Sequence, residues 1–186
     1  MKTKKIIFLT LIIINCITIF YFSNQVADTS STSSGKVVNL VIKVVPKLKN
    51  MQEHEKEYMA NEVLQHIVRK LAHFSIYTLL GFFNMNYALA CKKENDVCYT
   101  DEQCMPLQYK KDRCKNKIIL FSRLFGTLYA VTDEIHQLFI QGRSCEFRDV
   151  CIDSLGVLTG IIVALTISKI YINIKNKLSK ERTSKN

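Results

Sequence analysis

The sequence predicts an all-α integral membrane protein, a bundle of four transmembrane helices with both termini in the cytoplasm. Two observations lead to this prediction. Of the 186 residues 48% are hydrophobic, and they gather in long runs. The formal net charge is +10, and the Lys and Arg residues collect between those runs. A basic domain that binds nucleic acid would instead interleave its charges along amphipathic helices, so we expect no nucleic-acid partner.

The first apolar run covers residues 6–22 and follows Lys2, Lys4 and Lys5. A secretory signal peptide has the same charge pattern, but this run lacks a small-x-small cleavage site. Its apolar stretch is also long enough to span a bilayer. We therefore predict that the segment is retained as the first transmembrane helix.

Three further runs complete the predicted bundle, and each reaches the roughly 20 residues that a bilayer needs. They are residues 71–91, 118–140 and 150–172.

The basic segments determine the predicted orientation. Lys and Arg are abundant at the N-terminus, in the 92–117 loop and in the 176–186 tail. Four spans bring these three segments to one side, which the positive-inside rule assigns to the cytoplasm. We therefore predict a transmembrane domain over residues 1–175, a cytoplasmic loop over 92–117 and a basic cytoplasmic tail over 176–186.

An outer insert, residues 27–65, separates the first two spans and begins with a polar linker. In residues 36–48, Lys36, Lys43 and Lys47 fall on one helical face with valines elsewhere around it. This pattern is typical of an amphipathic helix that lies in the membrane interface, and equally of a surface helix packed on the spans.

Polar clusters stand at the predicted outer end of every span. At 100° per residue, Arg69, Lys70, His73 and Tyr77 share an arc of about 100°. The second cluster, in residues 133–137, covers about 160°. Each cluster can therefore face the inside of the bundle. The second cluster consists of Asp133, Glu134, His136 and Gln137. The third cluster consists of Asp149 and Asp153.

An ionisable group inside a bilayer costs on the order of 3 kcal/mol and is by default a functional candidate. Asp133 lies nearly two turns before the end of its predicted span, so it needs a partner. The alternative is that these residues only join the helices by hydrogen bonds. We expect Gly156 and Gly160 to form a packing groove.

The same clusters resemble those of the VanZ-like membrane proteins, named for an accessory protein of teicoplanin resistance in Gram-positive bacteria. The resemblance covers residues 6–172, apart from the 27–65 and 92–116 segments. It implies a multi-pass cell-membrane protein of a Gram-positive bacterium, linked to glycopeptide resistance or envelope homeostasis. The residues that match the family's motifs are Phe22, Ser23, Gln25, Arg69, Lys70, Ala72, His73, Phe74, Tyr77, Leu80, Gly81, Asp133, Glu134, His136, Gln137, Phe139, Gly142, Arg143, Asp149, Val150, Asp153 and Gly156.

Three functions fit these residues. The first is a module that binds an anionic membrane lipid, a cell-wall lipid precursor or a glycopeptide through Arg69, Lys70, Arg143 and Arg148. Another function is purely structural: the polar cluster only holds the helix bundle together. For the first function the candidate ligand-binding residues are Ser23, Gln25, Arg69, Lys70, Tyr77, Gln137, Arg143, Asp149 and Asp153.

The second function is an intramembrane enzyme acting on an envelope lipid or peptide. His73 or His136 would serve as general base, oriented by Asp133 or Glu134. We predict no dedicated metal ligands and no cofactor, although Asp149 and Asp153, one turn apart, can hold a divalent cation against a phosphate. No HExxH, GxSxG or Walker motif defines the reaction.

Overall fold

The structure is a computed structural model, and it describes residues 2–25, 38, 58, 64–95, 107–141, 143 and 145–183. All secondary structure in this part of the chain is helical, which confirms the all-α prediction. The four long helices are α1 (Lys2–Ser23), α5 (Gln65–Asn95), α6 (Leu107–Gln137) and α7 (Phe147–Thr183).

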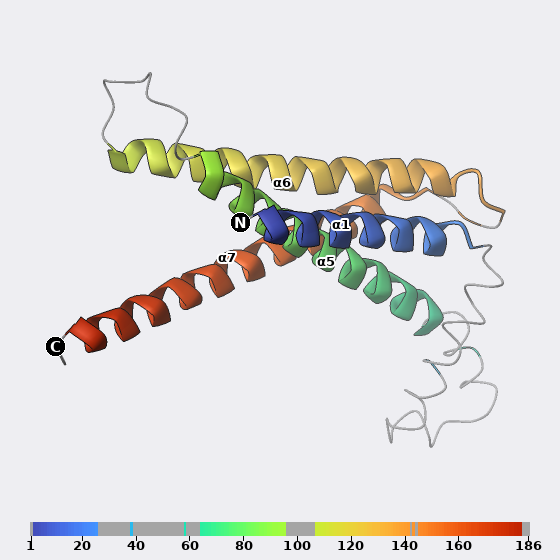
Figure 1. Cartoon of the computed structure of the whole chain (residues 1–186). Coiled ribbons are helices and arrows are strands. Elements are labelled where there is room, and N and C mark those ends of the chain that lie inside the picture. Colours follow the sequence, from blue (N-terminus) through green and yellow to red (C-terminus); the bar gives the residue numbers. More distant parts are fainter. Residues whose placement is uncertain are drawn as a thin grey trace, which may run out of the picture.

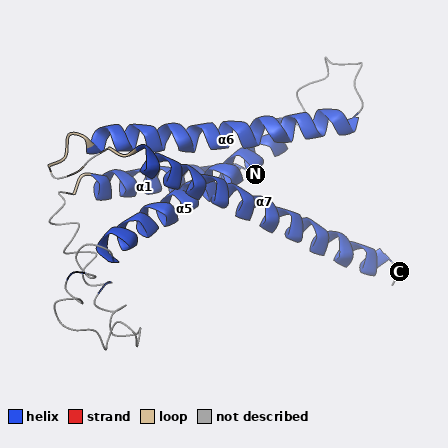
Figure 2. Cartoon of the chain, turned by 180° about the vertical axis from the view of Figure 1, so that it is seen from behind, coloured by secondary structure: helices blue, strands red, loops and turns tan. Residues whose placement is uncertain are grey.

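The helices alternate in direction, so four particular helix ends lie at one end of the bundle (Figure 1). These are the C-termini of α1 and α6 and the N-termini of α5 and α7. Viewed from behind, α7 crosses the other helices and its C-terminal half extends away from them (Figure 2). The shared end is the one that carries the polar clusters of the sequence.

Helices α5 and α7 approach most closely, and glycine permits the approach. A Cβ atom on Gly160 would overlap the carbonyl oxygen of Thr78, and one on Gly81 would overlap the carbonyl oxygen of Val157. Small residues let helix backbones come this near to each other. The predicted packing role of Gly160 is therefore confirmed.

All four helices contribute side chains to the core. Tyr77 and Leu80 of α5 and Val157 of α7 are fully buried, next to Ile19 of α1 and Ala130 of α6. Two side-chain hydrogen bonds reinforce the packing. Asn84 Nδ2 donates to the Ser122 carbonyl oxygen (3.0 Å), and the Tyr129 hydroxyl donates to the Cys16 carbonyl oxygen (2.8 Å).

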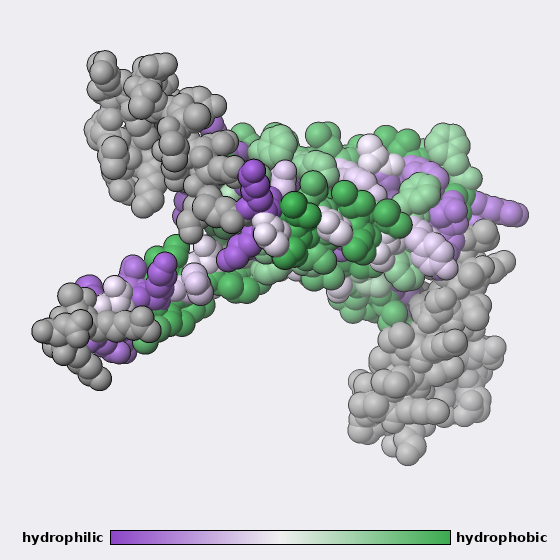
Figure 3. Space-filling model, viewed as in Figure 1, coloured by the Kyte–Doolittle hydropathy of each residue, from purple (hydrophilic) through white to green (hydrophobic). Residues whose placement is uncertain are grey.

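Large apolar side chains also cover the outside of the helices. Phe121, Leu128 and Ile17 are each more than 60% exposed. In the space-filling view, hydrophobic surface covers much of the middle of the described helices, and hydrophilic residues gather toward their ends (Figure 3). Exposed apolar surface of this extent is typical of a protein that meets lipid.

Within the described residues, two helices are long and apolar enough to cross a membrane by length and composition: α1, and α7 over Phe147–Glu181. Helices α5 and α6 are each 31 residues long but carry polar groups in their apolar stretches. These include His73, Asn84 and Asp133, all of which face inward or toward the cavity described below. In α5 and α6, the residues that make internal contacts are therefore the ones that lower the mean hydropathy.

The helix bounds differ from the predicted spans. Helix α5 continues to Asn95, and α6 begins at Leu107, so the described part of the predicted 92–117 loop is helical. Helix α7 runs to Thr183, through most of the predicted 176–186 tail. Hydropathy marks where the apolar stretch ends, whereas Lys, Gln and Glu are good helix formers and extend the helix.

One helix is shorter than its predicted span at the polar end. Helix α6 stops at Gln137, and turns follow over residues 138–141 instead of the helix predicted to 140. Nearly all of the 27–65 insert, with its predicted amphipathic helix, lies outside the described residues.

Candidate functional site

A polar cavity of about 60 Å³ opens at the shared end of the bundle. Polar residues of three helices and of the loop between α6 and α7 meet there. The lining residues are Arg69, Lys70 and His73 of α5, Glu134 and Gln137 of α6, Arg143 and Glu146 of the α6–α7 loop, and Asp149, Ile152 and Asp153 of α7.

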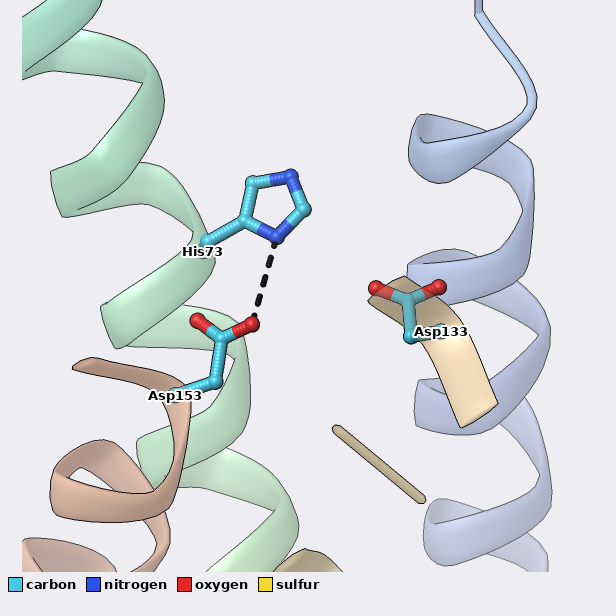
Figure 4. Close-up of side chains that lie close together, drawn as sticks. All are labelled: His73, Asp133 and Asp153. Carbon is cyan, nitrogen blue, oxygen red and sulfur yellow. Dashed lines mark ion pairs between the residues drawn. The ribbon is translucent and has the colours of Figure 1, made fainter. Parts of the chain in front are cut away.

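Three ionisable side chains form the innermost group of this site. His73 Nδ1 lies 3.8 Å from Asp153 Oδ2. Asp133 of α6 faces this pair from the other side (Figure 4), and one potential ligand atom from each of the three residues lies within 4.8 Å of the others. Asp133 is 5% exposed and Asp153 is 2% exposed. This group can hold a metal ion or share a proton.

Tyr77 lies beside the same group, one turn after His73 on α5. The residue is fully buried, and its hydroxyl lies near enough to Asp133 for a long hydrogen bond, although it forms none of normal geometry. The hydroxyl interacts electrostatically with both Asp133 and Asp153. Asp153 Oδ2 is buried as well, and its contact with His73 Nδ1, at 3.8 Å, is longer than a normal hydrogen bond. Buried polar atoms normally have partners at hydrogen-bond distance, so two buried atoms with only long contacts in one place are unusual.

Lys70 occupies the mouth of the cavity and is held by two carboxylates. Its Nζ donates a short hydrogen bond to Asp149 Oδ1 and lies 3.7 Å from Glu146 Oε2. Asp149 therefore pairs with Lys70 and does not belong to the group of His73, Asp133 and Asp153. Of the two carboxylates predicted to hold a divalent cation together, only Asp153 lies in that group.

Glu146 is a member of the site that the sequence analysis did not single out. It precedes the first residue of α7, and its carbonyl oxygen accepts a hydrogen bond from Asp149 N (2.9 Å). Its own backbone N donates to Glu134 Oε2 (3.2 Å). Glu146 lies four residues before the predicted fourth span, and only the general preference for acidic residues near a helix N-terminus could have indicated it.

Gln137 connects the site to α1. Its side-chain Nε2 donates to Ser23 Oγ (3.3 Å) and to Asp133 Oδ2 (3.4 Å). Its Oε1 accepts from Arg143 Nη1 (3.2 Å), and Arg143 Nη2 donates to the Phe22 carbonyl oxygen (3.3 Å). Ser23, Gln137 and Arg143 thus form one network that fixes the end of α1 against α6.

Two guanidinium groups stand on the cavity wall without a carboxylate in ion-pair distance among the described residues. Arg69 Nη2 lies 3.5 Å from His66 Nδ1, and Arg143 bonds to neutral groups. Burial lowers the pKa of Arg143, and repulsion from Arg69 lowers it further. Burial, with the charges of Lys70 and Arg69, also lowers the pKa of His66. The carboxylates of Asp133 and Glu134 raise the pKa of Arg143, by less than burial and Arg69 lower it.

Several predicted site residues lie elsewhere. His136 stacks on Phe20 of α1, with ring centroids 4.9 Å apart, and does not line the cavity. Gln25 follows α1 and donates its backbone N to the Phe22 carbonyl oxygen (3.3 Å). Arg148 is exposed and pairs with Glu146. The structure does not bring these three side chains to His73.

Comparison with known proteins gives one family. The family model described as VanZ/LLP1 matches residues 8–168, which is most of the chain. No curated protein and no solved structure matches the chain significantly.

Proposed function

The chain belongs to the VanZ/LLP1 family, and we propose that it is a multi-pass membrane protein that binds the anionic headgroup of an envelope lipid or lipid-linked cell-wall precursor. The observation that carries the proposal is the pair Arg69 and Arg143. Both line one cavity, neither has a carboxylate partner among the residues described, and their charges repel each other. A phosphate between them would replace repulsion with charge-assisted hydrogen bonds.

The cavity volume restricts the ligand. About 60 Å³ holds a few water molecules or one small polar group, far below the several hundred Å³ of a pocket for a drug-sized molecule. The cavity thus suits a phosphate headgroup whose lipid tail remains in the bilayer. A link to teicoplanin resistance would then act through an envelope lipid or precursor and not through capture of the whole glycopeptide.

Four spans would place this cavity at the outer membrane face. Helices α5 and α6 have 31 residues each, or roughly 46 Å at 1.5 Å per residue, which exceeds a bilayer core. The Lys-rich segments stand at the opposite end from the cavity, where the positive-inside rule puts the cytoplasm. Lipids of the cell membrane and the cell-wall precursors that reach its outer leaflet are the ligands available there.

Direct binding tests the proposal. The purified chain in detergent is mixed with a polyprenyl phosphate or phosphatidylglycerol, and bound lipid is counted by native mass spectrometry. Phosphatidylcholine, which has no net charge, is the comparison lipid. Arg69→Gln and Arg143→Gln should each weaken anionic-lipid binding about tenfold or more, since a charged hydrogen bond contributes about 1.5–3 kcal/mol. Lys175→Gln, at the far end of α7, removes the same charge and should leave binding unchanged.

Two results would overturn the proposal: equal binding of phosphatidylcholine, or loss of binding in Lys175→Gln equal to that in Arg69→Gln. The link to resistance has its own test. A Gram-positive host that produces the wild-type chain should tolerate more teicoplanin than the same host producing Arg69→Gln at an equal protein level.

A second function is favoured by the contact of His73 with Asp153. Asp153 can hold the proton on His73 Nδ1, which leaves the other ring nitrogen free to act as general base toward the cavity. The protein would then be an intramembrane enzyme that acts on an envelope lipid or peptide. Lipid extracts of cells producing wild type or His73→Gln would differ in one lipid product if this holds, and would be identical if the site only binds.

A further inference from the structure

We propose that His73, Asp133 and Asp153 form a binding site for one divalent transition-metal ion, Mn²⁺ or Zn²⁺. The three residues come from three helices, α5, α6 and α7, so an ion there would also join these helices. The site needs no lipid and stands independently of the anion-binding function.

The geometry is close to that of a metal site. In a tetrahedral site with ligand bonds of about 2.1 Å, ligand atoms are about 3.4 Å apart. His73 Nδ1 and Asp153 Oδ2 are already 3.8 Å apart, and all three ligand atoms lie within 4.8 Å of one another. Bringing the three ligand atoms from separations of up to 4.8 Å to about 3.4 Å requires them to close by up to about 1.4 Å.

The charge balance of the group favours a cation. Asp133 and Asp153 are both buried, and no Lys or Arg of the described residues lies within ion-pair distance of either. Lys70, the nearest candidate along α5, is instead bound to Asp149 and Glu146. Two buried carboxylates without a cation are unfavourable, and a bound metal ion compensates them.

Unpaired and orienting groups around the cluster provide a second, independent observation. The hydroxyl of Tyr77 is fully buried, forms no hydrogen bond of normal geometry, and interacts with both carboxylates, with Asp133 more strongly than with Asp153. Gln137 donates a hydrogen bond to Asp133 Oδ2 and so orients this carboxylate. Metal ligands are commonly oriented by such outer hydrogen bonds.

The ligand set selects the class of ion. Ca²⁺ and Mg²⁺ take oxygen ligands, whereas one imidazole with two carboxylates suits Mn²⁺ or Zn²⁺. Three protein ligands leave further coordination positions open. Because His73 and Asp153 line the cavity, an open position can take a water molecule or a phosphate oxygen.

Mn²⁺ binding to the purified, chelator-treated full chain tests the site. Mn²⁺ is the probe because the seven cysteines of the chain can bind Zn²⁺ through their thiolates. Titration followed by electron paramagnetic resonance should show one bound ion. His73→Gln, Asp133→Asn and Asp153→Asn should each weaken binding by about 100-fold, since even outer-shell changes cost 10–100-fold.

Asp149→Asn distinguishes the proposed site from a general acidic surface. Asp149 lies one turn from Asp153 but pairs with Lys70, so this variant should retain binding within about threefold, as expected of a charge outside the ligand set. Equal weakening in Asp149→Asn and Asp153→Asn would overturn the assignment. So would the absence of an ion bound at about 1 mM Mn²⁺, the weak end of protein sites for divalent ions.

The wild-type protein supplies a test that does not depend on the folding of variants. Pulsed resonance spectra of the Mn²⁺ complex should show coupling to an imidazole nitrogen, and this signal should change when histidine is labelled with ¹⁵N. A bound ion with no nitrogen coupling excludes His73 as a ligand and overturns the proposal.

Discussion

His73 on α5 and Asp153 on α7 are 80 residues apart in sequence, but His73 Nδ1 and Asp153 Oδ2 lie 3.8 Å apart and connect the two helices. Asp153 is almost completely buried, and His73 is its ion-pair partner among the described residues. The contact therefore gives a buried carboxylate a polar partner on another helix, and substitution of either residue has measurable consequences.

Removing His73 should destabilise the fold. His73→Gln leaves the Asp153 carboxylate without this partner, which costs about 1–3 kcal/mol. The double variant His73→Gln/Asp153→Asn should recover part of the loss, with a coupling energy of about 1 kcal/mol. Denaturant unfolding of the four proteins of this cycle in detergent, without added metal, measures the coupling. Additive effects of the two substitutions would mean that the pair does not interact.

Removing Asp133 should have the opposite effect on the metal-free protein. Asp133 repels Asp153 and has no ion pair among the described residues, so Asp133→Asn should stabilise the fold by about 1–2 kcal/mol. Asp149→Asn is the matched control and should not stabilise, because it breaks an existing ion pair with Lys70. Thermal unfolding in detergent with chelator present measures both variants. A lower melting temperature for Asp133→Asn would contradict this account.

The close approach of α5 and α7 should not tolerate a larger residue at Gly160. Gly160→Ala places a methyl group against the Thr78 backbone, and the helices must separate. Overpacking of this kind costs about 1–3 kcal/mol, and the yield of monodisperse protein should fall. Thr159→Ala changes the exposed neighbouring position and should leave yield and melting temperature unchanged. Normal stability of Gly160→Ala would show that this contact is not close.

The proposed orientation can be tested with a native residue. Cys145 is a free, exposed cysteine in the loop at the cavity end of the bundle. In a variant that keeps only this cysteine, a membrane-impermeant maleimide should label intact cells. A second variant carries a single cysteine at Lys177, on the far half of α7, and should react only after permeabilisation. The reverse pattern would place the cavity in the cytoplasm and remove the proposed outer-leaflet ligands.

The sequence predicts much of the architecture because the relevant signals are local. Apolar runs and basic flanking segments indicate four helices and their alternating direction, and this direction brings the polar clusters to one end. Helix bounds were less predictable. The apolar run ends near residue 172, but α7 continues to Thr183. The residues that follow, many of them Lys and Ile, can form a helix even though the segment is no longer apolar.

Side-chain partners depend on how each helix is rotated about its axis. The cluster from Asp133 to Gln137 spans about 160°, which is too wide to face one cavity. Glu134, at one edge of this arc, lines the cavity, whereas His136, at the other edge, stacks on Phe20 of α1. Sequence spacing allowed either histidine to serve as the base, and only the packing of α1 separates them.

By itself, the sequence determined that this chain forms long helices, that polar and charged residues gather at one end of them, and that the chain resembles a VanZ-like protein. Only the tertiary structure decided that Asp153 meets His73 and Asp133 while Asp149 meets Lys70. The physical reason is distance. Helical periodicity acts over a few residues, whereas these contacts depend on how closely α5 and α7 approach at their glycines and on how α6 is rotated against that pair.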